Sequence, residues 1–166
     1  NELDTEFFLR YGWEAGRADG STKNADSFVC DWMNRNFSGG HGSEVSELYN
    51  GFAQLTNVCK LEHMQSGKFS QTAYGDEGWW RLNRLRAVFD RANAIALSLP
   101  REEQDAFFQM ILMKVHAAWY INASFYCADR SRLCYERGAM HAADAYVDFS
   151  REMDDRKRRM LYRYNH

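Results

Sequence analysis

Proline is almost absent from this sequence. Pro100 is the single proline among 166 residues, whereas an average usage of ~5% would give about eight. Proline in a helix interior removes a hydrogen bond and kinks the helix, so a chain with one proline can form long uninterrupted helices. The scarcity of proline therefore permits a fold that is built from long helices.

Other absences exclude whole classes of protein. No apolar run approaches the ~18 residues that a membrane span needs. The formal net charge of −2 lacks the basic excess of a dedicated nucleic-acid binder. We therefore expect neither a membrane nor a nucleic acid among the partners, and the length and 45% hydrophobic content suit one domain with a real core.

Metal ligands at recognisable spacing are also missing. The chain has no C-x-x-C, H-E-x-x-H or E-x-x-H motif, and its four cysteines stand singly. Cys59 and His63 have helical i, i+4 spacing, but two ligands do not complete a site. We expect no metal and no cofactor, and the cysteines leave the cellular compartment open.

Helical periodicity is the strongest positive signal. Apolar residues recur at steps of three and four, and no segment has the period-two alternation of a half-buried strand. The pattern predicts an all-α fold, a five-helix antiparallel bundle. The expected helices cover residues 24–37, 43–63, 76–99, 100–137 and a final segment after Gly138. Residues 1–23 are expected to form a linker and residues 24–166 the helical bundle.

Several residues mark where these helices begin or bend. Ser43 and Asp76 are expected as N-caps, because their side chains can accept a hydrogen bond from the first turn. Pro100 is expected as the first residue of its helix. The segment from 100 to 137 is unusually long, and we expect a kink near Lys114 or Asp129.

Few residues suggest catalysis or binding. The adjacent carboxylates Asp76-Glu77, Glu102-Glu103 and Asp154-Asp155 point about 100° apart on a helix, so no acid/base pair and no catalytic residue is identified. Trp79 and Trp80 are weak substrate-binding candidates, because flat aromatic rings stack on sugars. Packing between helices or against a neighbouring domain explains the same doublet. Asn122 falls on an apolar stripe and is expected to be a hydrogen-bonded core amide.

Two segments in the first half of the chain resemble glycoside hydrolase family 115. Residues 6–9, Glu-Phe-Phe-Leu, with Trp13 look like the stretch that leaves that family's catalytic barrel. Residues 48–62 are similar to a helix that ends in the family's Arg-Lys-Pro-Glu motif, of which Lys60 and Glu62 match.

The resemblance continues to the end of the chain. Residues 99–109 resemble the start of the family's next long helix, and residues 161–165 resemble the stretch before its Gly-Gly-Lys-Trp segment. Cys59 stands where the family has arginine, and Leu61 where it has proline. The four motifs together span nearly all 166 residues.

The resemblance implies a role for the chain within a larger enzyme. The family's known enzymes are α-glucuronidases that act on xylan side chains, with the catalytic carboxylates in the barrel. The chain would be a non-catalytic helical domain C-terminal to that barrel, inactive alone. It would buttress the barrel, contact the parent's C-terminal β-domain or form a homo-oligomer interface, while xylan-derived glucuronosides would be substrates of the parent. The interdomain candidates are Phe7, Phe8, Trp13, Lys60 and Glu62.

Two further expectations accompany this interpretation. The chain starts at Asn1 without a basic and apolar leader, and residues 161–166 still look helical, so we expect a piece of a longer protein. The localisation of the piece is open, and the resemblance is compatible with a periplasmic or secreted parent. The alternative is a free-standing helical module that binds a carbohydrate or a protein, with a pocket in the bundle or an exposed row that includes Trp79 or Trp80.

Overall fold

The computed structural model describes residues 2–13 and 22–166, with the side chains of residues 22 and 23 left out. Every regular element in this part of the chain is helical, which confirms the all-α prediction. The α-helices are α1 (Glu2–Trp13), α2 (Thr22–Asn36), α3 (Gly42–Val58), α4 (Glu77–Ser98), α5 (Arg101–Phe107), α6 (Met113–Glu136) and α7 (Met140–Asn165). A 3-10 turn, η2, covers Leu61–His63, and a π-helical turn, η3, covers Phe108–Leu112.

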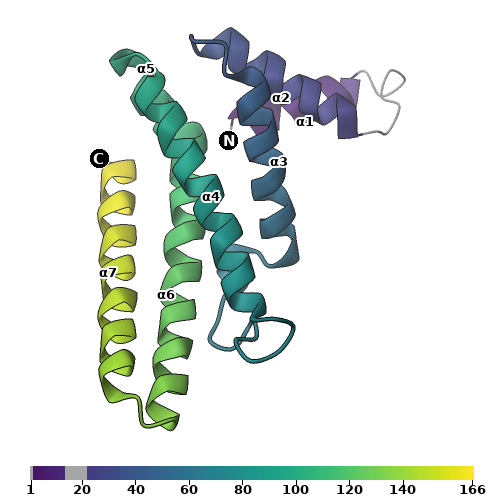
Figure 1. Cartoon of the computed structure of the whole chain (residues 1–166). Helices are drawn as coiled ribbons and strands as arrows, with labels where there is room; N and C mark the ends of the chain where they lie inside the picture. Colours follow the sequence, from purple (N-terminus) through teal and green to yellow (C-terminus); the bar gives the residue numbers. More distant parts are fainter. Residues whose placement is uncertain (1, 14–21) are drawn as a thin grey trace.

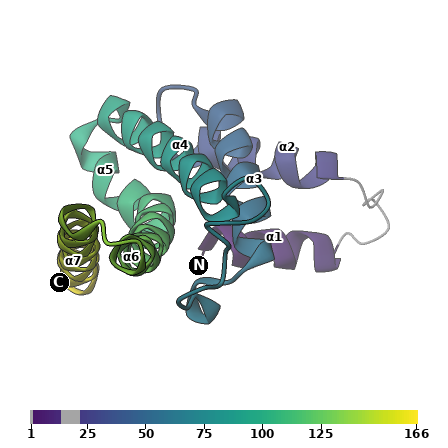
Figure 2. The same cartoon turned by 60° about the horizontal axis from the view of Figure 1, so that its bottom comes forward.

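The long helices form a bundle with two helices added at one end. Figure 1 shows α3, α4, α6 and α7 following one another up and down the molecule, with α6 and α7 as a hairpin. The shorter α1 and α2 extend sideways from the end at which α3 begins, and the turned view in Figure 2 keeps them together beside α3. No described helix combines the length and apolar character needed to cross a membrane.

The prediction of five helices is wrong, because residues 2–13 form an additional one. With α5, η3 and α6 counted as one continuous helix, the described residues form six. Leu3, Phe7 and Tyr11 recur every four residues and face α2, where the Phe7 ring lies 5.2 Å from the Phe28 ring. Tyr11 Oη donates a 2.9 Å hydrogen bond to the carbonyl of Asn24. Residues 14–21 of the expected linker lie outside the described residues.

The start of α3 differs from the prediction that Ser43 is its N-cap. His41 occupies the N-cap position, and the backbone N–H of Gly42 donates to Asn34 Oδ1 at 3.0 Å. A side chain from α2 therefore caps α3, which sequence spacing within α3 alone cannot reveal. The helix also ends at Val58 rather than near His63, because Cys59 is extended.

The N-cap residues of α4 and α5 are Asp76 and Pro100. Asp76 is the N-cap of α4, as predicted, and its side chain accepts a hydrogen bond from the Trp79 N–H at 2.9 Å. Pro100 is the N-cap of α5 rather than its first residue. The expected irregularity is the π turn η3, which ends just before Lys114, whereas Asp129 lies in unbroken helix.

Helix packing buries a continuous apolar core. Its most deeply buried side chains come from five elements and include Phe28, Met33, Val45, Leu85, Ile95, Phe107 and Ile111. The π turn places Phe107 and Phe108 next to each other in this core. The apolar stripes therefore predict most of the core correctly.

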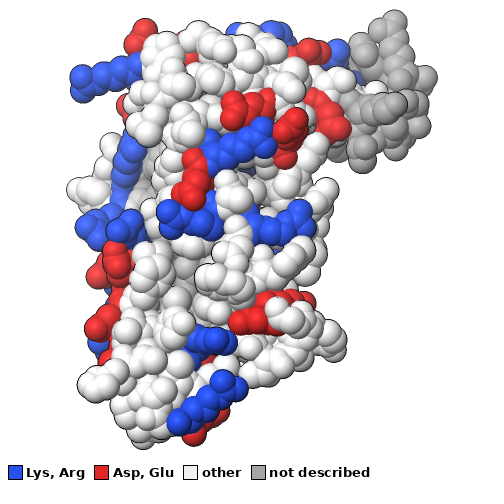
Figure 3. All heavy atoms as spheres, viewed as in Figure 1, with Lys and Arg blue, Asp and Glu red and all other residues white. Residues whose placement is uncertain are grey.

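Charged residues cover the surface without a one-sign patch on the face drawn in Figure 3, where blue and red groups are interspersed. The basic run at residues 156–159 is an example. Arg156 pairs with Glu152 at 2.7 Å and Arg158 with Asp154 at 2.8 Å, one helical turn apart. The run is a solvated helix face with local ion pairs.

Candidate functional site

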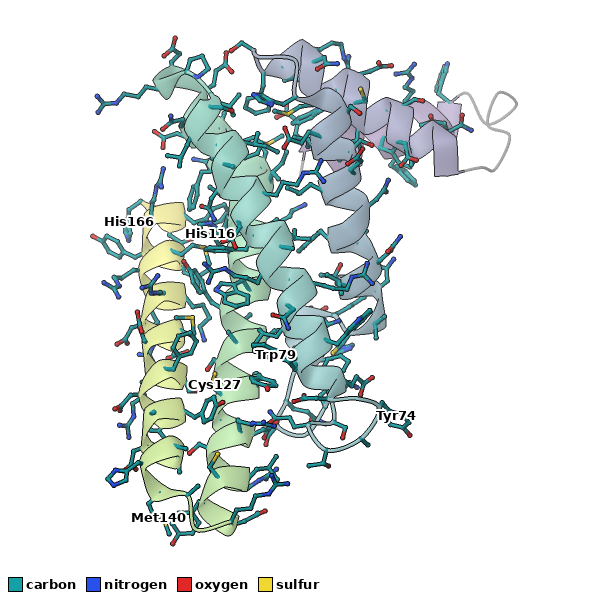
Figure 4. The ribbon with its side chains drawn as sticks, viewed as in Figure 1. Tyr74, Trp79, His116, Cys127, Met140 and His166 are labelled. Carbon is teal, nitrogen blue, oxygen red and sulfur yellow. The ribbon has the colours of Figure 1, made fainter. Side chains whose placement is uncertain are left out.

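An open apolar groove lies where α4, α6 and α7 meet. Its volume is about 590 Å³, within the range of small-molecule and peptide pockets, which is about 300 to 1,000 Å³. Figure 4 shows Trp79 of α4 and Cys127 of α6 in this region. The lining residues are Trp79, Leu82, Asn83, Arg86, Trp119, Tyr126, Cys127, Ala142, Ala145, Tyr146 and Phe149.

Aromatic rings form much of the groove wall. Trp79 and Tyr126 have ring centroids 6.0 Å apart, in a tilted arrangement. Trp119 is buried at the groove's base, whereas Trp79 is 51% exposed and Phe149 41% exposed. Half-exposed aromatic side chains offer contact area at little entropic cost, which is typical of recognition surfaces.

The groove remains open because α7 packs along α6. Two serine hydroxyls fix this hairpin: Ser131 Oγ donates to the Ala143 carbonyl at 2.8 Å, and Ser150 Oγ donates to the Ser124 carbonyl at 2.9 Å. On the groove side of α7, small residues such as Ala145 leave space that a larger side chain would fill. The apolar stripe of α7 therefore lines a groove over part of its length.

Polar chemistry in the groove is sparse. Arg86 pairs with Asp90 at 2.8 Å, and its guanidinium carbon lies 5.2 Å from the Trp119 ring. Asn83 is the other strongly polar side chain in the lining, which contains no carboxylate and no imidazole. The groove therefore offers mainly apolar contact, with one amide, one paired cation, two tyrosine hydroxyls and one thiol as its polar groups.

Two titratable groups in the wall, Cys127 and Tyr126, are held neutral. Burial raises the pKa of the Cys127 thiol to about 11, so the thiol is protonated at neutral pH. Burial, with the nearby Asp76 carboxylate as a smaller cause, raises the pKa of Tyr126 to about 12. The Tyr126 hydroxyl donates to Asp76 at 3.4 Å, and Asp76 also pairs with Arg130 at 3.4 Å. This network joins the start of α4 to α6 at one end of the groove.

A buried arginine forms a second polar cluster, behind the groove. Arg81 lies on α4 among other arginines of the sequence, yet it is only 4% exposed. Its Nε donates to Asn122 Oδ1 at 2.8 Å and its Nη1 to the Leu55 carbonyl at 2.6 Å, while the guanidinium carbon lies 4.4 Å from the Phe69 ring. Burial lowers the pKa of Arg81 from its ordinary value, although arginine stays charged. The expected core amide at Asn122 is confirmed.

His116 is a half-buried histidine that packs against α4. Its Nε2 lies 3.0 Å from Asn93 Oδ1, and its ring stacks on Phe89 at 4.6 Å. Asn93 Nδ2 donates to the Phe89 carbonyl at 2.7 Å. The amide oxygen of Asn93 therefore faces the imidazole, and Nε2 must carry the proton. Burial, with Arg163 as a second cause, lowers the pKa of His116 to about 4.

The two tryptophan candidates do not form one surface. Trp79 lies in the groove, whereas Trp80 is 56% exposed with the Arg84 guanidinium 4.8 Å from its ring. The groove residues Tyr146 and Phe149 were missed as binding candidates. Both fit the apolar stripe of α7 in sequence, so only the structure reveals their partial exposure.

The interdomain candidates lie in two different places. Phe7 is turned into the core, whereas Phe8 is 74% and Trp13 is 93% exposed on α1. Lys60 and Glu62 are exposed in the loop that follows α3. The structure therefore leaves four of the five side chains accessible but does not gather them into one cluster.

Comparison with known proteins identifies no family for this chain. No protein-family model matches the chain, and no curated protein matches it. The resemblance to glycoside hydrolase family 115 remains a prediction that depends on the sequence motifs.

Proposed function

We propose that this chain is a non-catalytic helical domain of a xylan α-1,2-glucuronidase-like glycoside hydrolase, and that it buttresses the catalytic barrel. The observation that carries the proposal is a second apolar face of α1 at Leu9 and Trp13, with a further exposed apolar side chain, Phe8, on its flank. The sequence motifs described above supply the identity of the partner. An oligomer interface at the same face is the other role compatible with them.

The physical argument begins with the two faces of α1. Its inner face already packs on α2 through Leu3, Phe7 and Tyr11. On the outer face, Leu9 and Trp13 are one turn apart, with exposures of 63% and 93%. A surface helix normally has one apolar face, and a helix that is apolar on two faces is usually covered on both.

The gain from covering this face is substantial. Full burial of a large aromatic or aliphatic side chain stabilises an interface by about 1.5 to 3 kcal/mol. Trp13 has almost its whole side chain available, and Phe8 has three quarters of it. A barrel surface seated on α1 would therefore gain several kcal/mol before ordering costs.

The test uses the complete gene product and the isolated chain in parallel. Replacing Phe8 and Trp13 with serine should leave the thermal midpoint of the isolated chain nearly unchanged, because both side chains face solvent. In the complete protein the same pair should lower the midpoint by several degrees and reduce glucuronic acid release from glucuronoxylan. Trp80→Ser is the matched control, since it removes an exposed tryptophan from another helix.

Several outcomes would contradict the proposal. A complete gene without a catalytic barrel upstream of α1 would remove the partner. Release of glucuronic acid by the isolated chain would refute the non-catalytic role. Concentration-dependent dimerisation that Trp13→Ser abolishes would favour the oligomer interface instead.

The groove favours a second candidate function, a free-standing binding module. Its aromatic walls and open volume match the pocket that this alternative requires. The few polar groups in its lining suit an apolar protein segment better than a sugar, because sugars need many hydrogen-bond partners. Titration of the isolated chain with xylan oligosaccharides, with Trp79→Ala as a control, separates the alternatives. Sugar binding that requires Trp79 would favour the carbohydrate module over the buttressing domain.

A further inference from the structure

Two buried polar atoms have no hydrogen-bond partner within the described residues, and they belong to side chains that line one small cavity. Arg81 Nη2 is a donor, and Gln71 Oε1 is an acceptor. Arg81 is 4% and Gln71 is 9% exposed. The cavity lies between the loop of residues 60–76, α4 and α6, and its volume is about 20 Å³.

The other atoms of both side chains are already engaged. Arg81 uses Nε and Nη1 for Asn122 and the Leu55 carbonyl. Gln71 Nε2 donates to the Tyr126 carbonyl at 2.7 Å, which fixes the orientation of its amide. The amide oxygen is therefore the unpaired atom of Gln71, and the unpaired atom of Arg81 is Nη2.

We propose that this cavity binds a single internal water molecule, which accepts a hydrogen bond from Arg81 Nη2 and donates one to Gln71 Oε1. A buried water needs about 10 to 15 Å³ of such space and two to four polar partners. The cavity has room for one water and little more. Asn122 and Asp129 also line it and have oxygen lone pairs that can accept the second proton.

The charges around the cavity select water over an ion. A monatomic anion would be attracted by Arg81, but it would face the Gln71 amide oxygen and the Asp129 carboxylate. A cation would be repelled by the Arg81 guanidinium. Water is neutral and serves as donor and acceptor, so it satisfies both unpaired atoms at once.

The water would complete the attachment of the loop to the bundle. Asp129 Oδ2 accepts from the Gly67 N–H at 2.7 Å, and the Ser70 carbonyl accepts from the Gly78 N–H at 2.8 Å. Without regular structure beyond η2, the loop depends on such polar contacts for its order. The hydration site connects the middle of the loop, at Gln71, to α4.

A crystal structure at a resolution that resolves waters, with a parallel bromide soak, tests the site directly. We expect one water within hydrogen-bond distance of Arg81 Nη2 and Gln71 Oε1, and a matching long-lived water signal in water–protein NMR cross-relaxation. A bromide anomalous peak in the cavity would overturn the proposal. A direct bond between Arg81 Nη2 and Gln71 Oε1, or a cavity without an ordered water, would overturn it too.

A pair of glutamine variants extends the test to solution. Gln71→Met removes the acceptor, and Gln65→Met alters an exposed residue of the same cavity lining. We expect the water signal to disappear in Gln71→Met and to persist in Gln65→Met. Amide exchange at Gly67 and Gly78 should become about tenfold faster in Gln71→Met alone. A water signal that survives in Gln71→Met would contradict the assigned partners.

Discussion

His116 gives the chain a measurable sensitivity to acid. The change to make is His116→Gln, because glutamine does not titrate and its amide N–H can still donate to Asn93 Oδ1. Burial among Phe89 and Tyr120, with the Arg163 cation as a smaller cause, lowers the pKa of His116 from 6.5 to about 4. Protonation inside the fold would therefore place a second cation beside Arg163 in a poorly solvated site.

Proton linkage gives the direction and the size of the change in the free energy of unfolding with pH. Between the two pKa values the unfolded chain binds the proton and the folded chain does not, so the free energy of unfolding falls as the pH drops below 6.5 and levels off below about 4. The full shift would correspond to about 3 kcal/mol. Because the imidazole is only partly buried, solvent screening reduces the expected loss to about 1 to 2 kcal/mol.

The assay is chemical denaturation at a series of pH values from 7.5 to 4 (about half-unit steps), followed by far-ultraviolet circular dichroism. Carboxylates titrate in both proteins, so the informative quantity is the difference in unfolding free energy between wild type and His116→Gln. We expect this difference to shift by about 1 to 2 kcal/mol in favour of the variant as the pH falls. Parallel curves across this range, or an NMR titration of His116 near its unperturbed pKa, would refute the reasoning.

Three further substitutions test the fold and its surface by thermal or chemical denaturation. Gly42→Ala places a methyl 2.4 Å from the Cys30 carbonyl oxygen and 2.6 Å from the Asn34 side chain, so we expect a loss of about 2 to 3 kcal/mol; a neutral result would contradict this tight helix crossing. Gly138→Ala puts an L side chain at φ +74°, in the turn between α6 and α7. We expect it to lower the free energy of unfolding by about 1 kcal/mol. Trp80→Ala removes a side chain that is 56% exposed, so we expect a change in the free energy of unfolding below about 0.5 kcal/mol; a larger loss would contradict its mainly solvent-facing position.

Local chemistry explains why much of the fold could be predicted. Asp76 caps α4 because its own side chain reaches the first turn, and Gly39 and Gly40 end α2 with positive φ values. Such signals depend on residues within one turn of each other. The start of α3 could not be predicted in this way, because Asn34 of the preceding helix supplies the cap.

The missed helix has a different cause. Residues 2–13 contain an apolar repeat at Leu3, Phe7 and Tyr11, but the further apolar residues Phe8, Leu9 and Trp13 lie elsewhere around the helix and obscure the amphipathic pattern. The groove was missed for a related reason. A stripe such as Tyr146, Phe149 and Met153 predicts burial, yet Met153 is buried and Phe149 is 41% exposed, because α7 packs on α6 alone near its beginning.

Of the two buried polar partners, the sequence predicts Asn122 but not Arg81. Asn122 interrupts an apolar stripe, and a buried amide requires a polar partner from somewhere in the fold. The partner is Arg81, which the sequence places among Arg84 and Arg86 as one more surface cation. The apolar stripe of α4 does not reveal which arginine of this run is turned into the interior. A lone polar residue on a core stripe therefore indicates a buried polar or charged partner on another helix. In this chain the partner is Arg81, which lines the cavity where we place a bound water.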